Sequence, residues 1–107
     1  MIRVTALYPR TGDSHFDMDY YLNKHIPMVV SKFQSLGFPI QMQVDDGLGG
    51  GMSGEPAPYA TIGFMLFENV DHLQQGMAAH GAEIMGDIPN FTNVQPTIQI
   101  SNIVLVS

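Results

Sequence analysis

The sequence predicts an α+β fold in which a four-stranded antiparallel sheet carries two helices on one face. Two observations support this prediction. Four segments contain the alternating or apolar runs that are typical of strands, and two segments between them repeat apolar residues at helical spacing. The chain has 107 residues without an internal repeat or a linker, so we expect residues 1–107 to form a single domain.

The first strand and the first helix follow directly from these patterns. Residues 2–8 alternate in part and predict a strand that ends at Pro9. Asp17 is suited to cap a helix, which we prefer to a catalytic role for this carboxylate. The helix is expected to end before Gly37. Its apolar stripe contains Leu22, His25, Val29, Phe33 and Leu36.

Pro27 lies inside this first helix and is expected to break or kink it. A proline disfavours the α conformation at the residue before it, so Ile26 is predicted to leave the α region. The break would then help to place the His25 side chain, which lies just before it.

The middle of the chain predicts two strands joined by a glycine-rich loop. Residues 40–44 alternate apolar residues with Gln41 and Gln43, which indicates a half-buried strand. Residues 47–54 are rich in glycine and form a mobile hairpin loop rather than a phosphate-binding loop. Residues 59–67 alternate again, with Ala60, Ile62, Phe64 and Leu66 on one face and Thr61 and Gly63 on the other.

The last third of the chain predicts a second helix and a final strand. Asn69 or Asp71 is expected to cap the helix, and Gly81 to end or bend it. Residues 89–96 form a loop, and residues 97–106 form the last strand. The apolar stripe of this helix contains Leu73, Met77, His80 and Ile84.

The resulting order, β-α-β-β-α-β, is the ferredoxin-like arrangement. Both helices then cover one face of the sheet, and the other face is bare in a monomer. This open face is expected to carry Gln41, Gln43 and Thr61 among apolar residues. The chain also has few charges to cover its surface. We therefore predict a homodimer through the open face.

Composition excludes several classes of protein and site. The formal charge of −6 and the four scattered basic residues argue against nucleic-acid binding. No cysteine is present, so the chain forms no disulfide, and we expect a cytoplasmic protein. No signal peptide or apolar run of membrane-spanning length is seen, so we expect no membrane partner. The spacing of histidines and carboxylates favours no metal site.

Two segments of this chain resemble a known protein family. Tyr8-Pro9, followed by Phe16-Asp17, Tyr20-Tyr21-Leu22, His25 and Pro27, is similar to the N-terminal signature of the EthD family, which is named for ethyl tert-butyl ether degradation. Residues 84–97, IMGDIPNFTNVQPT, resemble the stretch that these proteins carry before their last strand. The resemblance covers nearly the whole chain.

The resemblance implies a dimeric α+β barrel, in which two ferredoxin-like units join their sheets across a two-fold axis. Relatives in this superfamily include isomerases, small monooxygenases, polyketide cyclases and some haem proteins. Fungal relatives with this domain act on phenolic polyketides, and bacterial members belong to degradation gene clusters. Because one fold serves so many reactions, the function has to be argued from the site.

The candidate catalytic residues are His25, His80 and Tyr21. His25 lies on the inward stripe of the first helix, where it could exchange a proton or simply bond a carbonyl freed near Pro27. His80 lies on the inward stripe of the second helix, either as a satisfied core residue or in a shared cavity with His25. Tyr21 is four residues before His25, so the two side chains share a helical face.

The candidate substrate-binding residues are apolar or aromatic and are expected to wall a cavity between helices and sheet. Tyr8 at the end of the first strand can reach this space, although simple packing of its ring is the alternative. Burial would lower the pKa of both histidines and leave neutral imidazoles. The full set of expected wall residues is Tyr8, Leu22, Phe64, Leu73, Met77 and Phe91.

These features favour a cofactor-free enzyme of degradative metabolism, of ethers, xenobiotics or aromatics, that acts on a small oxygenated apolar compound. The chemistry expected of such a site is proton transfer of the lyase, isomerase or decarboxylase type. A small-ligand binding protein without turnover is the alternative from another class. A haem protein with His80 as the axial ligand is a third hypothesis, supported by that single histidine alone.

Overall fold

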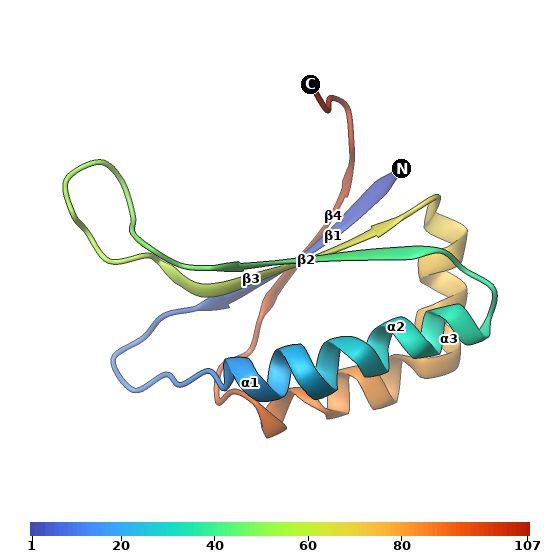
Figure 1. The fold of residues 1–107 in the computed structure, drawn as a ribbon, viewed down its shortest axis with the longest axis horizontal. Helices are drawn as coiled ribbons and strands as arrows, with labels where there is room; N and C mark the ends of the chain where they lie inside the picture. The colour runs from blue at the N-terminus through green and yellow to red at the C-terminus, as the bar shows by residue number, and fades with distance from the viewer.

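The computed structural model describes residues 1–107 and has one four-stranded sheet with a layer of helices on one side (Figure 1). Two long helical segments, each following a strand, form that layer. The elements are β1 (Ile2–Pro9), α1 (Met18–Tyr20), η1 (Tyr21–His25), α2 (Ile26–Ser35), β2 (Ile40–Asp46), β3 (Tyr59–Phe67), α3 (Val70–Gly86), η2 (Ile88–Asn90) and β4 (Thr97–Asn102). The predicted β-α-β-β-α-β order is confirmed.

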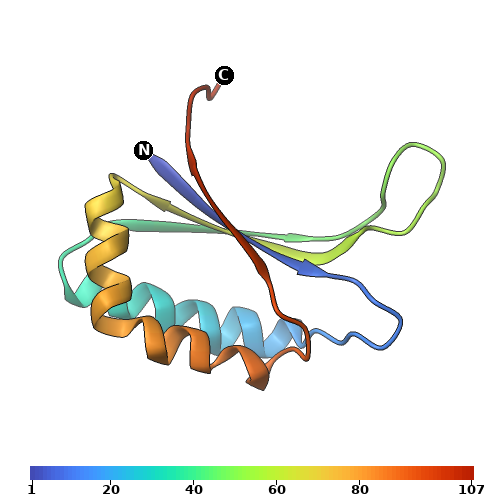
Figure 2. The same ribbon diagram turned by 180° about the vertical axis from the view of Figure 1, so that it is seen from behind.

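The sheet is antiparallel throughout, with the strand order β2-β3-β1-β4. The pairing register decides which residues face the helices. Val4 lies opposite Met65 on one side and Ile100 on the other, and these residues face the helix layer. Figures 1 and 2 show both long helices below the sheet and no helix above it. The ferredoxin-like α+β fold is therefore confirmed, together with an open face on the sheet.

The faces of β3 are opposite to the sequence prediction for Thr61 and Phe64. Thr61 pairs with Tyr8 and is buried, with 1 % exposure, on the helix side. Phe64 lies on the open face, where the guanidinium of Arg3 sits 5.7 Å from the centre of its ring. The alternation in β3 is ambiguous because apolar residues occupy both faces of this central strand.

The core consists of two clusters between the sheet and the helices. The larger cluster contains Ile2, Val4, Val29, Phe33, Phe67, Leu73 and Ile84. The second cluster contains Ala6, Tyr8, Tyr21 and Phe91. The first cluster is aliphatic and aromatic without a polar atom, whereas two of the four residues in the second carry a hydroxyl group. Polar chemistry is thus concentrated at one end of the layer.

The first helical segment is continuous across Pro27, so the predicted break is wrong. Ile26 keeps α-helical angles (φ −58°, ψ −48°), and its N–H bonds the carbonyl of Tyr21, five residues back. Residues 21–25 form a π-turn, which is wider than an α-turn. The wider turn accommodates the proline ring and its missing N–H without ending the helix. The segment begins as predicted, because the Asp17 carboxylate accepts the Tyr20 N–H at 3.1 Å.

The second helix and the last strand have different lengths from those predicted. Asn69 caps α3 by accepting the His72 N–H at 2.9 Å, and the helix continues through Gly81 to Gly86. The strand β4 ends at Asn102, opposite the first residue of β1, and the Ile103 N–H makes one further bond to the Met1 carbonyl. The tail formed by residues 103–107 leaves the sheet on the side away from the helices (Figure 2). Its side chains Val104, Leu105 and Val106 are 77–89 % exposed.

The glycine-rich segment between β2 and β3 forms a loop that projects beyond the sheet (Figure 1). Leu48 and Met52 in this loop are almost completely exposed. The loop carries turns and a single bridge between Gly50 and Glu55. No helix in the structure has the length and apolar character needed to cross a membrane.

The closest approach of the two helices depends on Gly76 in α3. A Cβ atom added at this position would clash with the ring of Phe33 from α2. Phe33 is fully buried and also packs on Phe67 from β3, with ring centres 4.8 Å apart. The ring therefore has no free space into which it could retreat, and glycine is required by close packing.

We expect Gly76→Ala to destabilise the fold by about 1–3 kcal/mol through overpacking. Alanine favours a helix over glycine by roughly 1 kcal/mol, which only partly offsets the clash. Urea unfolding measures the difference. Gly86→Ala is the matched control, because a Cβ there meets nothing within 4 Å. Equal stability of the two variants would disprove the packing argument.

Candidate functional site

The site is built around a hydrogen bond between His25 and Asp87. The Nδ1 atom of His25 lies 2.9 Å from Oδ2 of Asp87. His25 comes from the π-turn η1, and Asp87 is the residue that caps the C-terminal end of α3. The two residues are 62 positions apart in the chain, so the contact exists only in the folded protein.

Two further side chains hold the other oxygen of Asp87. The Tyr20 hydroxyl donates to Oδ1 at 2.7 Å, and the Asn90 amide donates to the same atom at 2.9 Å. Both oxygens of the carboxylate are therefore occupied by donors. These bonds fix the direction in which Asp87 points, and hence the orientation of the His25 ring.

Electrostatics at this pair favour a neutral imidazole beside an ionised carboxylate. Burial lowers the pKa of His25 below its ordinary value, and the hydrogen bond and charge of Asp87 only partly oppose this. Burial acts to raise the pKa of Asp87, but the bonds from Tyr20, Asn90 and His25 outweigh it and lower the pKa. The ionised carboxylate can only accept, so the imidazole proton lies on Nδ1 and Nε2 keeps its lone pair.

The π-turn stacks the side chain of Tyr21 on that of His25. Their ring centres are 5.5 Å apart, and the planes differ by 14°. Phe91 is fully buried and packs against the rings of both Tyr21 and His25. Its ring centre lies 4.7 Å from that of the imidazole. The imidazole thus has aromatic walls that restrict its motion and exclude water. π-turns inside α-helices are frequent at functional sites.

The hydroxyl groups of Tyr8 and Tyr21 lie close together beside His25. Burial and the neighbouring Tyr21 raise the pKa of Tyr8 far above its ordinary range. Burial raises the pKa of Tyr21 to about 12, although the neighbouring Tyr8 hydroxyl partly lowers it. Both phenols therefore stay protonated at neutral pH and can donate hydrogen bonds. The Tyr21 hydroxyl approaches Gly63 of β3 so closely that a Cβ there would clash with it.

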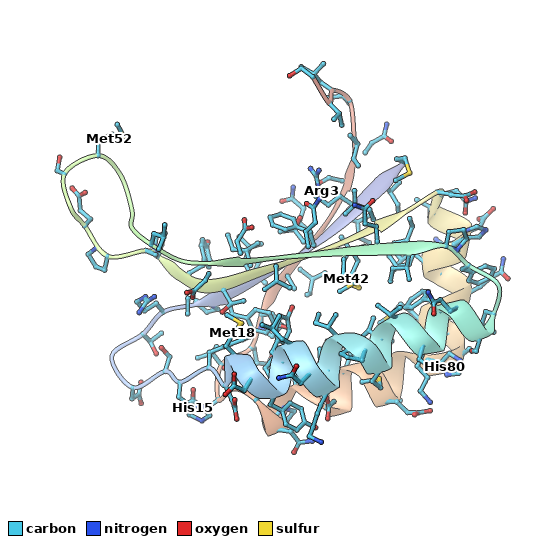
Figure 3. All side chains as sticks on the ribbon, in the orientation of Figure 1. Arg3, His15, Met18, Met42, Met52 and His80 are labelled. Carbon is cyan, nitrogen blue, oxygen red and sulfur yellow. The ribbon has the colours of Figure 1, made fainter.

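These groups meet at a cavity of about 50 Å³ between the helices and the sheet. Its walls are almost entirely apolar, and the only polar side chains in them belong to His25, Tyr8 and Tyr21. Figure 3 shows Met42 of β2 pointing from the sheet toward the helices, whereas Arg3 lies on the opposite side of the sheet. Three polar groups converging in an apolar hollow are typical of a small-ligand site.

His80 does not share this cavity with His25, contrary to the sequence expectation. It lies in the helix layer (Figure 3), where its Nδ1 is 4.0 Å from the carboxylate of Glu83. Glu83 also pairs with Lys32 of α2 at 2.8 Å. The apolar stripe of α3 contacts two neighbours, the sheet and α2. His80 lies on the part of the stripe that is next to α2.

The expected wall residues are only partly brought together. Tyr8 lines the cavity, and Phe91 supports the imidazole from behind. Leu22 is 45 % exposed on the outer surface of the first helix, so its expected place in the wall is wrong. Phe64 is also wrongly assigned, because it lies on the open face of the sheet.

Leu73 and Met77 lie near the cavity but do not line it. Leu73 is buried in the larger core cluster, and Met77 packs against that cluster. Both residues line a groove between α3 and β4 instead. Their positions along α3 place them about two or more turns before the end of the helix, where Asp87 meets His25.

Three residues of the site were not predicted from the sequence: Asp87, Tyr20 and Asn90. Asp87 follows directly on the second helix and precedes Pro89, so its position at a helix end was visible in the sequence. The residues next to Asp87 in the sequence do not indicate that its carboxylate contacts His25. No group of three or more histidine, aspartate or glutamate side chains is arranged to hold a metal ion.

Comparison with known proteins identifies the family. The model of the EthD domain matches residues 11–95, a range that contains His25 and Asp87. The chain belongs to the EthD family. The resemblance seen in the two sequence segments is thereby confirmed.

Solved structures of EthD proteins have the same fold. An EthD-like protein from Ralstonia eutropha JMP134 is 35 % identical, with a TM-score of 0.89 over 99 % of this chain and 94 % of that one. An ethyl tert-butyl ether degradation family protein from Bacillus halodurans C-125 is 23 % identical, with a TM-score of 0.63 over 97 % and 99 % of the two chains. The second similarity supports the fold alone. The chain matches no protein of curated function.

We expect Asp87→Asn to lower the pKa of His25 further, because the hydrogen bond and charge of Asp87 are the influences that raise it. An NMR titration of the imidazole signals measures this pKa. Glu83→Gln is the matched control, since Glu83 approaches His80 and Lys32 but not His25. A higher or unchanged pKa in Asp87→Asn would show that the carboxylate does not act on the imidazole.

Proposed function

We propose that this EthD protein is a cofactor-independent enzyme that moves a proton on a small, neutral, oxygenated and largely apolar compound. The observation that carries the proposal is the 2.9 Å contact of His25 Nδ1 with Asp87, beside an apolar cavity. A histidine held at one nitrogen by a carboxylate has its other nitrogen available as a base. The reaction class that fits is isomerisation, elimination or decarboxylation.

In the proposed reaction, Nε2 of His25 takes a proton from a carbon next to a carbonyl group. The electron pair of the broken C–H bond moves toward the carbonyl, and negative charge develops on its oxygen. Returning the proton to another position completes an isomerisation, and loss of a neighbouring group completes an elimination. Asp87 stabilises the imidazolium that exists between the two steps, because its carboxylate charge lies 2.9 Å from Nδ1 of the buried His25 ring.

The hydroxyl groups of Tyr8 and Tyr21 are proposed to receive the developing oxyanion. The raised pKa of each phenol keeps its proton in place at neutral pH. Donors that are fixed before the reaction stabilise charge without reorganisation during it. His25 supplies the base, and the two tyrosines supply the donors for the oxyanion. Proton transfer with these groups needs no metal or organic cofactor, so we propose a cofactor-free reaction.

The Bacillus halodurans relative is named for ethyl tert-butyl ether degradation. We carry over only the general context and propose that this protein serves a degradative pathway for ethers, other xenobiotics or aromatic compounds. The lack of cysteine suits a reducing compartment, so we place the protein in the cytoplasm. His80 receives no reacting role in this proposal, because the α2 side of α3 holds it away from the cavity.

Exchange of hydrogen for deuterium tests the proposal without knowledge of the natural substrate. We expect the native protein in D₂O to exchange the α-hydrogens of some compounds in a panel of small ketones and lactones. The rate should be constant above the pKa of His25 and fall below it, because only the neutral imidazole accepts a proton. Burial lowers this pKa, so the fall should begin below the ordinary histidine range.

His25→Gln is expected to remove the exchange, and Asp87→Asn to slow it by roughly ten- to a hundredfold through loss of ring orientation. His72→Gln is the matched control, since this histidine stacks on Phe38 with ring centres 4.3 Å apart, outside the site. NMR integration of the substrate signals gives each rate. Equal exchange by native protein and His25→Gln would refute the assignment of the base.

A binding protein without turnover is the second candidate function. The observation that favours it is the small, apolar cavity itself, which would hold a ligand in the same place. The two functions differ in the exchange experiment. Ligand binding that shifts the His25 signals, without deuterium uptake by any member of the panel, would favour the binding function.

We propose, in addition, that the protein is a homodimer through the open face of the sheet. Partly exposed apolar side chains of β1 and β3 lie on this face, which no helix covers (Figure 1): Leu7, Ile62 and Phe64. The guanidinium of Arg3 lies over the ring of Phe64 on this face, and its buried Nε has no hydrogen-bond partner within the chain. A second copy related by a two-fold axis would bury the same residues on both chains.

We expect the native protein to sediment as a dimer at micromolar concentration, and the double variant Ile62→Lys, Phe64→Lys to sediment as a monomer. The new cations would repel each other and Arg3 of the same face. Analytical ultracentrifugation measures the mass. Leu48→Lys is the control, because Leu48 is 98 % exposed in the loop beyond the sheet. A native monomer would remove the basis for this interface.

A further inference from the structure

An apolar groove lies next to the His25 cavity, in the space between α3 and β4. The groove has a volume of about 280 Å³, and all but one of its lining residues are hydrophobic. Four residues line both the groove and the cavity: Met65, Ile84, Met85 and Ile98. The two hollows are therefore neighbours that share a wall, with the polar groups at the cavity end only.

The groove exposes apolar surface that the fold leaves uncovered. Met85, Ile98 and Ile100 are 46 %, 45 % and 58 % exposed, although all three belong to helix α3 or to the helix side of β4. The edge strand β4 extends beyond the cover that α3 provides. Contiguous apolar surface in a hollow next to a polar site is typical of ligand-binding grooves.

The cavity at His25 is too small to hold a whole ligand of ordinary size. Its volume of about 50 Å³ suits a carbonyl group and a few atoms beside it. Ligand sites in proteins usually have roughly 300–1,000 Å³. A ligand whose oxygen lies against His25 must therefore place the rest of its atoms in an adjoining space, and the groove is the apolar space that adjoins it.

We propose that the groove binds the hydrocarbon chain of a ligand whose neutral carbonyl group lies against His25. The inference rests on the proposed function and narrows its substrate class to medium-chain, neutral carbonyl compounds. A carboxylate at this end is disfavoured, because Asp87 is ionised beside His25 and no cation lines either hollow. Along α3, the groove is lined from Leu73 to Met85, residues that are about 18 Å apart along the helix. An extended chain of roughly ten carbon atoms is shorter than this span and fits within it.

Methionine methyl groups report on the two hollows separately. Met42 lines only the cavity, and Met77 lines only the groove. Met52, which is completely exposed in the β2–β3 loop, is the internal control. The experiment records ¹³C-methyl methionine NMR spectra of the full chain during titration with 2-butanone, 2-hexanone and 2-decanone.

We expect 2-butanone to shift the Met42 signal and leave Met77 unchanged, whereas 2-decanone shifts both signals. The dissociation constant should fall by about two- to fourfold for each added methylene group, up to the length of the groove. Met52 should not respond to any of the ketones. Affinity that is independent of chain length, or a Met77 signal that never responds, would overturn the proposal.

A charged residue in the groove provides a matched test. Ile100→Arg should weaken binding of 2-decanone by tenfold or more and leave the response of Met42 to 2-butanone unchanged. Ile100 is 58 % exposed at an edge strand, so the arginine can be accommodated without unfolding. Val104→Arg places the same charge in the exposed tail beyond the groove and should leave both ketones unaffected.

Three other outcomes have defined meanings. If Val104→Arg shifts the Met77 signal in ligand-free protein, the tail of a neighbouring copy covers the groove and the proposal is overturned. Chain-length-dependent binding without any deuterium exchange would support the groove assignment and reject proton transfer. Deuterium exchange of short ketones, with an affinity that does not depend on chain length, would support proton transfer and reject the groove assignment. The two proposals can therefore fail separately.

Discussion

The hydrogen bond between His25 and Asp87 is the interaction on which the arrangement of the site depends. A buried imidazole and a partly buried carboxylate are each unfavourable alone, because both lose contact with water. Together they satisfy each other, and Tyr20 and Asn90 satisfy the remaining carboxylate oxygen. The bond also joins the π-turn of the first helical segment to the end of α3. Any shift of one helix along the other would break it.

Three local features allow this bond to form. The π-turn places Tyr21 and His25 on the inner side and keeps the helix continuous across Pro27. Gly63 leaves room on the sheet for the Tyr21 hydroxyl, and Gly76 lets Phe33 approach α3. The helix layer is therefore tightly packed at the Phe33 end and holds a polar cavity at the other. Because α3 packs toward α2, β4 stays partly uncovered, and the groove lies along this uncovered edge.

The parts of the fold that depend on neighbouring residues could be predicted from the sequence. Asp17 and Asn69 cap helices through hydrogen bonds to backbone N–H groups three residues away. The ferredoxin-like sheet follows from the β-α-β-β-α-β order of strands and helices along the chain. Contacts between distant residues could not be predicted in the same way. Asp87 meets His25 across 62 positions, and the face of Phe64 depends on the register of β3 with β1. His80 lies on an apolar stripe that faces two partners, so the stripe alone does not decide between them.

The charge state of the pair explains why a neutral ligand suits this site. The Asp87 carboxylate keeps its charge and His25 stays neutral, so the resting site already contains one unbalanced negative charge. A second anion near Nε2 would be repelled in surroundings of low polarity, where charges interact strongly. A proton taken from a neutral ligand has the opposite effect, because it converts the imidazole into a cation beside the carboxylate. The new negative charge on the ligand then lies next to that cation and the two phenol donors. Charge is therefore best balanced in the site when the proton has moved, and this condition favours catalysis over simple binding.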